Sequence, residues 1–336
     1  MGKNKISRLF YRFPFLALFY DFNIIKRVYK KFFVNHVYTS NYYIELTNRC
    51  NAECVFCPYV PLREGGKPLM SMSDDIFEKA IALIKTQKRP SILLTPTTGE
   101  IFMNIKWDHY IQRILDMDFV ESSYFYTNGL LLNAQNREKF VHLKNLHKLS
   151  LSFSVGGIDR ETYKYMYGKD KFDVVVENIS EFLKALKDCS LEVPVVVDIK
   201  LPKNARFSRS LAKSVYNPHD YKYAMLKVRR TFDMMQGLIT DTNLGEIKPI
   251  PLSEKKRPCR NLQDIRFAAN GSIWLCGCAI SELPGHYDLK VGDISQEKDL
   301  SNIMQRQKAI EEKWFYHQDI PHNCKECTWY VADRSR

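Results

Sequence analysis

The chain has 336 residues, nine cysteines and a formal net charge of +12 at pH 7. Hydrophobic residues make up 45% of it, so wholesale disorder is excluded, and a chain of this length can bury a large core. It contains no run of eighteen apolar residues, which excludes a membrane-spanning helix.

The basic charge is concentrated at the start of the chain. Residues 1–40 hold eight Lys and Arg residues against Asp21 alone, a net charge of +7, and are rich in Phe and Tyr. A signal peptide is disfavoured, because the apolar stretch is short, contains Pro14 and lacks a small-residue cleavage site. Two interpretations stay open: a peripheral segment that contacts the inner face of an anionic membrane, or helices that pack outside the main domain.

The first predicted strand, Tyr42–Leu46, leads into a loop that carries Cys50, Cys54 and Cys57. Three thiolates on a short loop can hold three irons of a [4Fe–4S] cluster and leave the fourth iron open. A structural zinc site is the alternative, but it requires a fourth ligand, and no further Cys or His lies nearby in the sequence. The odd number of cysteines and the long chain indicate a cytoplasmic protein rather than a disulfide scaffold.

Helices and strands alternate after this loop. Six strands alternating with helices predict a parallel α/β unit, an open partial barrel, with its site at the carboxyl ends of the strands. Besides the first strand we expect strands over residues 91–94, 122–126, 149–154, 193–201 and 225–229, and helices over residues 74–86, 107–117, 135–141 and 173–186, the first of them capped by Ser73.

The spacing Cys-x3-Cys-x2-Cys after a first strand, with Phe56 directly before the last cysteine, resembles the signature of the radical S-adenosylmethionine (SAM) superfamily. The resemblance implies that Cys50, Cys54 and Cys57 hold a [4Fe–4S] cluster. It also implies that the amino and carboxylate groups of SAM chelate the open iron, and that Phe56 lies near the adenine. The expected fold is a partial (β/α)6 TIM-like barrel over residues 41–235.

Three later motifs resemble SAM contacts of the same family. Gly99 and Glu100 stand where the family has Gly-Gly-Glu-Pro, although the first Gly and the Pro are absent. Asn128 belongs to a Thr-Asn-Gly that commonly follows the third strand, and Ser154 takes the place of a serine that helps to hold SAM. Gly156 replaces a usual Asp. Ordinary turns are the alternative interpretation of each motif.

A second set of cysteines follows the predicted barrel: Cys259, Cys276, Cys324 and Cys327. By spacing alone these two pairs suit either zinc or [4Fe–4S]. With Gly292-Asp293-Ile294 between them, they resemble the SPASM or shorter twitch extension of radical SAM enzymes. The resemblance implies a small C-terminal domain over residues 236–336 that holds one auxiliary [4Fe–4S] cluster, since the full SPASM pattern needs more cysteines.

Cys278 is left over, two residues after a predicted ligand. It is either a hydrogen-atom donor to a substrate radical or a spare thiol that could replace Cys276. An oxidation also needs a base, for which Asp198, Arg229 and Asp233 are candidates. Arg229 could equally bind a phosphate or carboxylate.

The resemblance implies a radical SAM oxidoreductase of the dehydrogenase or epimerase type. An electron donor such as flavodoxin or ferredoxin reduces the first cluster, SAM is cleaved to a 5′-deoxyadenosyl radical, and the radical removes a hydrogen from the substrate. A sugar, cyclitol or glycan is the expected substrate. The alternatives are a peptide- or protein-modifying SPASM maturase, and a zinc-containing protein that modifies or binds RNA. Nucleic acid is disfavoured because the basic charge is not spread over the chain.

Overall fold

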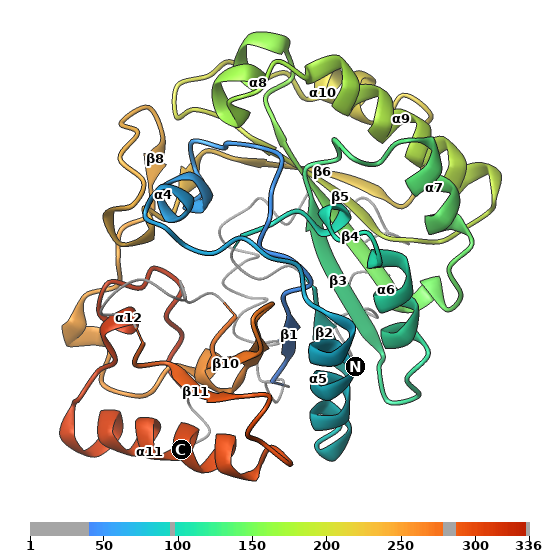
Figure 1. Ribbon diagram of the computed structural model, residues 1–336. Coiled ribbons are helices and arrows are strands. Elements are labelled where there is room, and N and C mark those ends of the chain that lie inside the picture. Colours follow the sequence, from blue (N-terminus) through green and yellow to red (C-terminus); the bar gives the residue numbers. More distant parts are fainter. Residues whose placement is uncertain (1–39, 95–97, 278–286, 334–336) are drawn as a thin grey trace, which may run out of the picture.

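The computed structural model describes residues 40–94, 98–277 and 287–333. In this part of the chain one sheet of nine strands has the order β11-β10-β9-β1-β2-β3-β4-β5-β6. All neighbouring pairs from β9 through β1 to β6 are parallel, and β10 is antiparallel to both β9 and β11. Figure 1 shows the helices that connect the parallel strands around the outside of the sheet.

The bounds of the elements are as follows. The strands are β1 (Tyr42–Ile44), β2 (Ser91–Leu93), β3 (Ser122–Thr127), β4 (Leu149–Gly156), β5 (Val195–Lys200), β6 (Ala224–Arg229), β9 (Ile265–Phe267), β10 (Ser272–Leu275) and β11 (Lys290–Asp293), with β7 (Thr231–Phe232) and β8 (Gly245–Glu246) forming a separate pair. The α-helices are α4 (Tyr59–Glu64), α5 (Asp74–Thr86), α6 (Trp107–Leu115), α7 (Ala134–Val141), α8 (Arg160–Tyr167), α9 (Phe172–Asp188), α10 (Arg209–Tyr216), α11 (Ser301–His317) and α12 (His322–Lys325). Short 3-10 helices are η1 (Ile101–Met103), η2 (Leu146–Lys148), η3 (Met235–Gly237), η4 (Leu252–Glu254) and η5 (Arg260–Gln263).

The predicted α/β fold with its six parallel strands is confirmed. The predicted cap of α5 is also present, because the Ser73 hydroxyl accepts a hydrogen bond from the Ile76 amide at 3.3 Å. Strand β1 ends at Ile44, two residues earlier than predicted. Strands β9, β10 and β11 were not predicted, since three or four residues are too few to show an alternating pattern.

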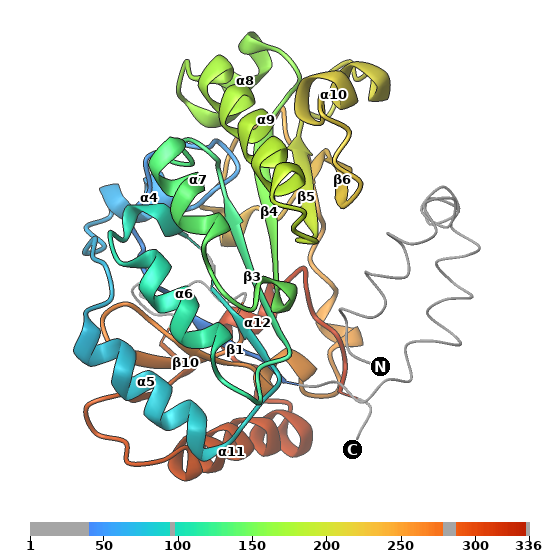
Figure 2. The same ribbon diagram turned by 90° about the vertical axis from the view of Figure 1, so that its right-hand side faces the viewer.

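The two faces of the parallel strands differ in character. The outer face carries Phe125 and Phe153, which pack with Phe140 of α7 and Phe182 of α9 at ring-centre distances of 4.9 to 6.5 Å. Figure 2 shows these helices lying along that face. The residues that alternate with Phe125 along β3 and with Phe153 along β4 point to the opposite side. The inner face therefore carries polar side chains: Tyr124, Tyr126, Ser150, Ser152 and Ser154.

The C-terminal part is joined to the first strand of the barrel. Asp264 precedes β9, and its Oδ1 accepts hydrogen bonds from the backbone amide of Asn41 at 2.7 Å and from its side chain at 3.0 Å. Arg89 donates to the carbonyls of Asn41 and Gln263 and lies 4.5 Å from the centre of the Tyr42 ring. The nine-stranded sheet therefore contains strands from both sides of the predicted domain boundary between residues 235 and 236. That boundary stays a prediction.

Helix α11 packs against β11 at the far end of the sheet (Figures 1 and 2). None of the described helices is long and apolar enough to cross a membrane. The two interpretations of the basic N-terminal extension concern residues that, apart from Ser40, lie outside the described part of the chain.

Candidate active site

The three cysteines of the first motif lie together on the loop after β1. The amide of Cys57 donates to the Cys54 carbonyl at 3.1 Å, and the Tyr59 hydroxyl donates to the Cys50 carbonyl at 3.0 Å. All three cysteines are partly buried, and the charge of each thiolate would act on at least one other. Burial raises the pKa of Cys50 to about 12 and the pKa of Cys57 to about 11. Ionised thiols here therefore need a bound cation.

This donor set fits an iron–sulfur cluster. None of the described cysteines forms a disulfide. Among all the residues that the structure describes, no three Cys, His, Asp or Glu side chains are arranged as ligands of one metal ion. In a [4Fe–4S] cluster each thiolate binds a different iron, so its ligands do not converge on a single ion.

Gly99 and Glu100 lie against the backbone of the cysteine loop. The Glu100 amide donates to the Arg49 carbonyl at 2.8 Å. Gly99 has a φ of +111°, and a Cβ atom there would lie 2.2 Å from the Thr47 carbonyl oxygen. Only glycine allows this approach. Thr97, at the start of the same motif, lies outside the described residues.

The Glu100 carboxylate connects this segment to the end of β3. It is 1% exposed and accepts hydrogen bonds from the Thr127 hydroxyl at 2.8 Å and the Asn128 amide at 2.7 Å. Burial raises the pKa of Glu100 to about 7, although these hydrogen bonds act in the opposite direction. The Asn128 side-chain amide donates to the side-chain oxygen Oδ1 of Asn51 at 2.8 Å and to the Cys50 sulfur at 3.8 Å. Asn128 thus reaches from β3 to the cysteine loop.

Tyr167, at the end of α8, brings Ser154 and Phe56 into one neighbourhood. Its hydroxyl donates to Ser154 Oγ at 2.8 Å, and its ring meets the Phe56 ring edge-on at 5.6 Å. Phe56 also stacks on Phe232 at 5.2 Å. A Cβ atom on Gly156 would lie 2.7 Å from the Tyr167 ring, so the aspartate that the family usually has here would clash with Tyr167.

Two of the three candidate bases meet on the inner face of β5 and β6. Asp198 is 1% exposed, and its Oδ2 accepts hydrogen bonds from Lys200 and, at 3.1 Å, from Arg229. Burial alone would raise the pKa of Asp198, but the charges of Lys200 and Arg229 outweigh it and lower the pKa. Burial lowers the pKa of Lys200 to about 8. Sequence reasoning missed Lys200; the available signal was the charged, apolar, charged alternation from residue 198 to residue 200.

Asp233 lies elsewhere. Its Oδ1 accepts from the Met235 amide at 2.7 Å and its Oδ2 from the Thr328 hydroxyl, so it joins the end of the barrel to the second cysteine region. Arg230 donates to the Pro202 and Lys203 carbonyls and holds a loop. The structure therefore brings Asp198 and Arg229 together and separates Asp233 from them.

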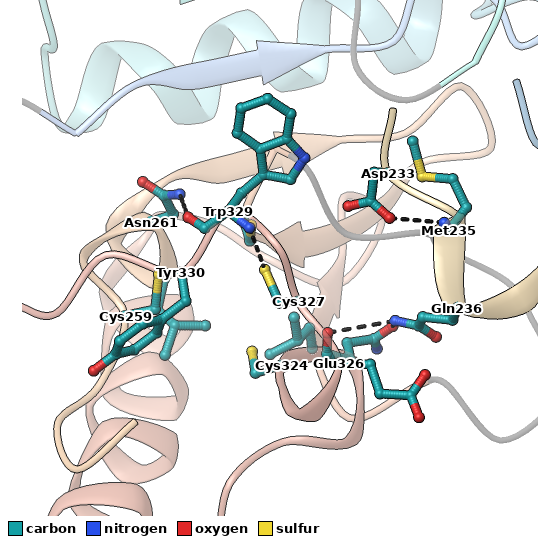
Figure 3. A pocket seen from close by; sticks show the side chains of 14 residues that line it. Asp233, Met235, Gln236, Cys259, Asn261, Cys324, Glu326, Cys327, Trp329 and Tyr330 are labelled. Carbon is teal, nitrogen blue, oxygen red and sulfur yellow. Dashed lines mark hydrogen bonds between the residues drawn. The ribbon is translucent and has the colours of Figure 1, made fainter. Parts of the chain in front are cut away.

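The second set of cysteines lines one pocket. Figure 3 shows the thiols of Cys259, Cys324 and Cys327 on the wall of this pocket, and Cys276 lines it as well. Backbone amides donate to two of the sulfurs, from Trp329 to Cys327 at 3.3 Å and from residue 331 to Cys259 at 3.4 Å. Such amide donors are typical of thiolate ligands in metal centres.

The charge of a buried lysine acts on this pocket. Lys255 is fully buried, and its ammonium group donates to the carbonyls of Cys324, Lys325 and Cys327 at 2.8, 2.9 and 3.1 Å. It thereby fixes the loop that carries two of the four thiols. No pattern in the sequence indicated this role. Cys278, for which a hydrogen-donor role and a spare thiol are the two interpretations, lies outside the described residues.

Comparisons with known proteins agree with this geometry. Residues 44–198 match the model of the radical SAM superfamily. The chain is 30% identical over 163 residues to a probable GTP 3′,8-cyclase of Saccharolobus islandicus (strain Y.N.15.51 / Yellowstone #2). That match covers 48% of each chain, so the chain spans about half the length of this curated relative.

Solved structures show the same fold over a longer stretch. A histidine-tagged form of anSMEcpe with bound AdoMet, which is SAM, is similar with a TM-score of 0.52 and 12% identity, over 82% of this chain and 83% of that one. Native anSMEcpe with bound AdoMet and Kp18Cys peptide has a TM-score of 0.52 and 13% identity, over 86% of each chain. Identity this low shows the fold alone. The residues that match the model of the radical SAM superfamily, 44–198, include the cysteine loop with Cys50, Cys54 and Cys57.

Proposed function

We propose that this chain is a radical SAM oxidoreductase that removes a hydrogen atom from a hydroxyl-bearing substrate, and that it carries two [4Fe–4S] clusters. The observation that carries the proposal is the convergence of Glu100, Asn128, Ser154 and Phe56, from separate parts of the chain, around the cysteine loop. When bound, the first cluster and SAM supply the 5′-deoxyadenosyl radical. The protein's own residues then bind, orient and exclude water.

Each residue of this site has a proposed role. Cys50, Cys54 and Cys57 hold the cluster. Glu100, with the backbone at Gly99, receives the amino group of SAM. Three further residues complete the proposed SAM contacts, and their neighbours support these roles: Asn128 lies beside Cys50, Ser154 beside Tyr167, and Phe56 on Phe232, where it can flank the adenine.

The second cluster is proposed for Cys259, Cys276, Cys324 and Cys327. Support comes from the shared pocket and from the amide donors to two sulfurs. Zinc is the competing occupant. Metal analysis of anaerobically reconstituted protein distinguishes an auxiliary [4Fe–4S] cluster from zinc. Two [4Fe–4S] clusters give about eight irons per chain, whereas one zinc with about four irons would contradict an auxiliary cluster.

A sugar, cyclitol or glycan remains the proposed substrate, oxidised or epimerised. Its support is the inner face of the barrel, where serine and tyrosine hydroxyls and the Asp198 carboxylate can hydrogen-bond to several hydroxyl groups. Asp198 is the proposed proton acceptor in an oxidation, because one of its oxygens has no hydrogen-bond partner. A peptide substrate is the alternative; the Kp18Cys peptide in the anSMEcpe structure belongs to that protein.

The test of the proposed function is the formation of 5′-deoxyadenosine. Reconstituted protein, SAM and a reductant such as dithionite, flavodoxin or ferredoxin should yield 5′-deoxyadenosine and methionine. The Cys54→Ala variant should lose this activity and about half of the iron, because only the first cluster is removed. A Cys189→Ala variant is the matched control, since Cys189 is exposed at the end of α9. No 5′-deoxyadenosine from fully loaded wild-type protein would refute the proposal.

Contact of residues 1–40 with a membrane also stays a proposal. Co-sedimentation with anionic liposomes, compared between the full chain and a chain without residues 1–38, tests it. Equal sedimentation of the two would refute it.

A further inference from the structure

We propose that the inner face of β5 and β6 binds an anionic group of the substrate, a carboxylate or a phosphate, with Lys227 and Arg229 as its ligands. The inference rests on the proposed function, because it names the class of substrate for the same site.

The strand register puts the charged residues of β5 and β6 on one face. Asp198 pairs with Lys227, and Lys200 pairs with Arg229. On the other side of β5, Asp198 pairs with Ser154, one of the proposed SAM contacts. Since paired residues of parallel strands point to the same side, these side chains share the inner face. The group therefore lies next to the place proposed for SAM, where the substrate hydrogen must also lie.

The charges in this group do not balance. It contains three cations and one carboxylate, and a single oxygen of Asp198 accepts from both Lys200 and Arg229. Among the described residues, Lys227 forms no ion pair, and the ion pair with Asp198 is the only one that Arg229 forms. Positive charge held in a partly desolvated site is unfavourable without a counter-ion. A ligand with one or two negative charges would restore the balance.

The donors of Arg229 point to the same conclusion. One terminal nitrogen is bound to Asp198, while Nε is buried and has no hydrogen-bond partner. A guanidinium group binds a carboxylate or phosphate through two parallel N–H bonds, and Nε is one of the donors available for this. Arg230 offers a contrast, because its bonds to two backbone carbonyls give it a structural role. Lys227 is exposed on the same face and can reach an incoming anion.

The carboxylate of SAM is a second source of the same chemistry, so the test separates the two. Isothermal titration calorimetry of the full, anaerobically reconstituted protein, preloaded with SAM, uses inorganic pyrophosphate and uncharged N-acetylglucosamine as probes. SAM itself is titrated in a separate arm. We expect pyrophosphate to bind the wild-type protein. The variants Arg229→Gln and Lys227→Met should each weaken pyrophosphate binding by at least about tenfold, and should leave SAM affinity unchanged.

Lys222→Met is the matched control. Lys222 lies before β6 and its side chain is 74% exposed, and its replacement by Met removes the same charge as Lys227→Met does. It should bind pyrophosphate as the wild type does. Equal pyrophosphate affinity in the wild type and in both site variants would overturn the proposal, as would no pyrophosphate binding in the millimolar range. An equal loss of SAM affinity would assign the cations to SAM and overturn it too. Formation of 5′-deoxyadenosine by the same wild-type sample shows independently whether the proposed function stands.

Discussion

At the scale of single residues, Cys50, Cys54 and Cys57 lie on one short loop after β1, and their role as cluster ligands is a proposal. The nearby residues Glu100, Asn128 and Ser154 were identified as candidates only through their resemblance to family motifs. The alternation from residue 198 to residue 200 places Asp198 and Lys200 on one face of a strand, but the pairing of Lys200 with Arg229 comes from the strand register. The contacts of Lys255 are with a loop 70 residues away, and they leave no local pattern in the sequence.

Glu100 predicts a pH dependence of stability. In the cluster-free protein burial raises its pKa from 4.5 to about 7, so between these values the folded state holds a proton that the unfolded chain has lost. The free energy of unfolding should therefore fall by up to about 3 kcal/mol as pH rises through this window. The Glu100→Gln variant should lack this part of the slope, whatever its baseline stability. Urea unfolding of both proteins near pH 5 and near pH 7 measures it, and parallel pH profiles would refute it.

At Gly156 we predict that the aspartate typical of the family would destabilise this protein. A Cβ atom would lie 2.7 Å from the Tyr167 ring and 2.8 Å from Met166 Cβ, both in the core. The Gly156→Asp variant should lower the free energy of unfolding by about 1–3 kcal/mol, and a buried unpaired carboxylate adds to this cost. Gly156→Ala should cost less. Thermal and urea unfolding test the order; an aspartate variant as stable as wild type would show that α8 can move aside.

At the scale of elements, the six parallel strands could be predicted from their apolar runs and the turns between them. Strands β9–β11 could not, because they are short and are held in place by distant residues such as Asn41. The same limit applies to the pocket that the second set of cysteines lines. Its cysteines were found in the sequence, but not the elements that surround them.

Helix α12 depends on a lysine from another segment. Its four residues are too few for a stable helix alone, and Lys255 binds three carbonyls in and after it. The Lys255→Met variant should lower the free energy of unfolding by about 3–5 kcal/mol, because three carbonyls lose a charged donor. The proposed second cluster should also become more labile. Urea unfolding and the iron remaining after gel filtration measure the two effects.

Lys256→Met is the control for this experiment. Lys256 is the exposed neighbour, and its replacement should change stability by no more than about 0.5 kcal/mol. If both variants kept wild-type stability and iron content, the buried ammonium would not be what holds the loop.

At the scale of the whole molecule, the C-terminal part completes the sheet that the barrel begins. Removal of residues 236–336 would expose the edge of β1, including Tyr42 and Ile44, which are fully buried in the intact protein. We expect the remaining chain to aggregate, because an unpaired apolar strand edge recruits other chains. Gel filtration of the truncated protein tests this. A monomeric, folded product would show that residues 41–235 form an independent domain.

The pairing of β1 with β9 also orders events during synthesis. Asn41 emerges from the ribosome more than two hundred residues before its partner Asp264. One edge of the nascent barrel therefore stays unpaired for most of translation, and contacts so distant in sequence form slowly. The cysteine loop, which continues from β1, cannot reach its final surroundings before β9 has been made. We therefore expect insertion of the first cluster into a finished site to be a late event in synthesis.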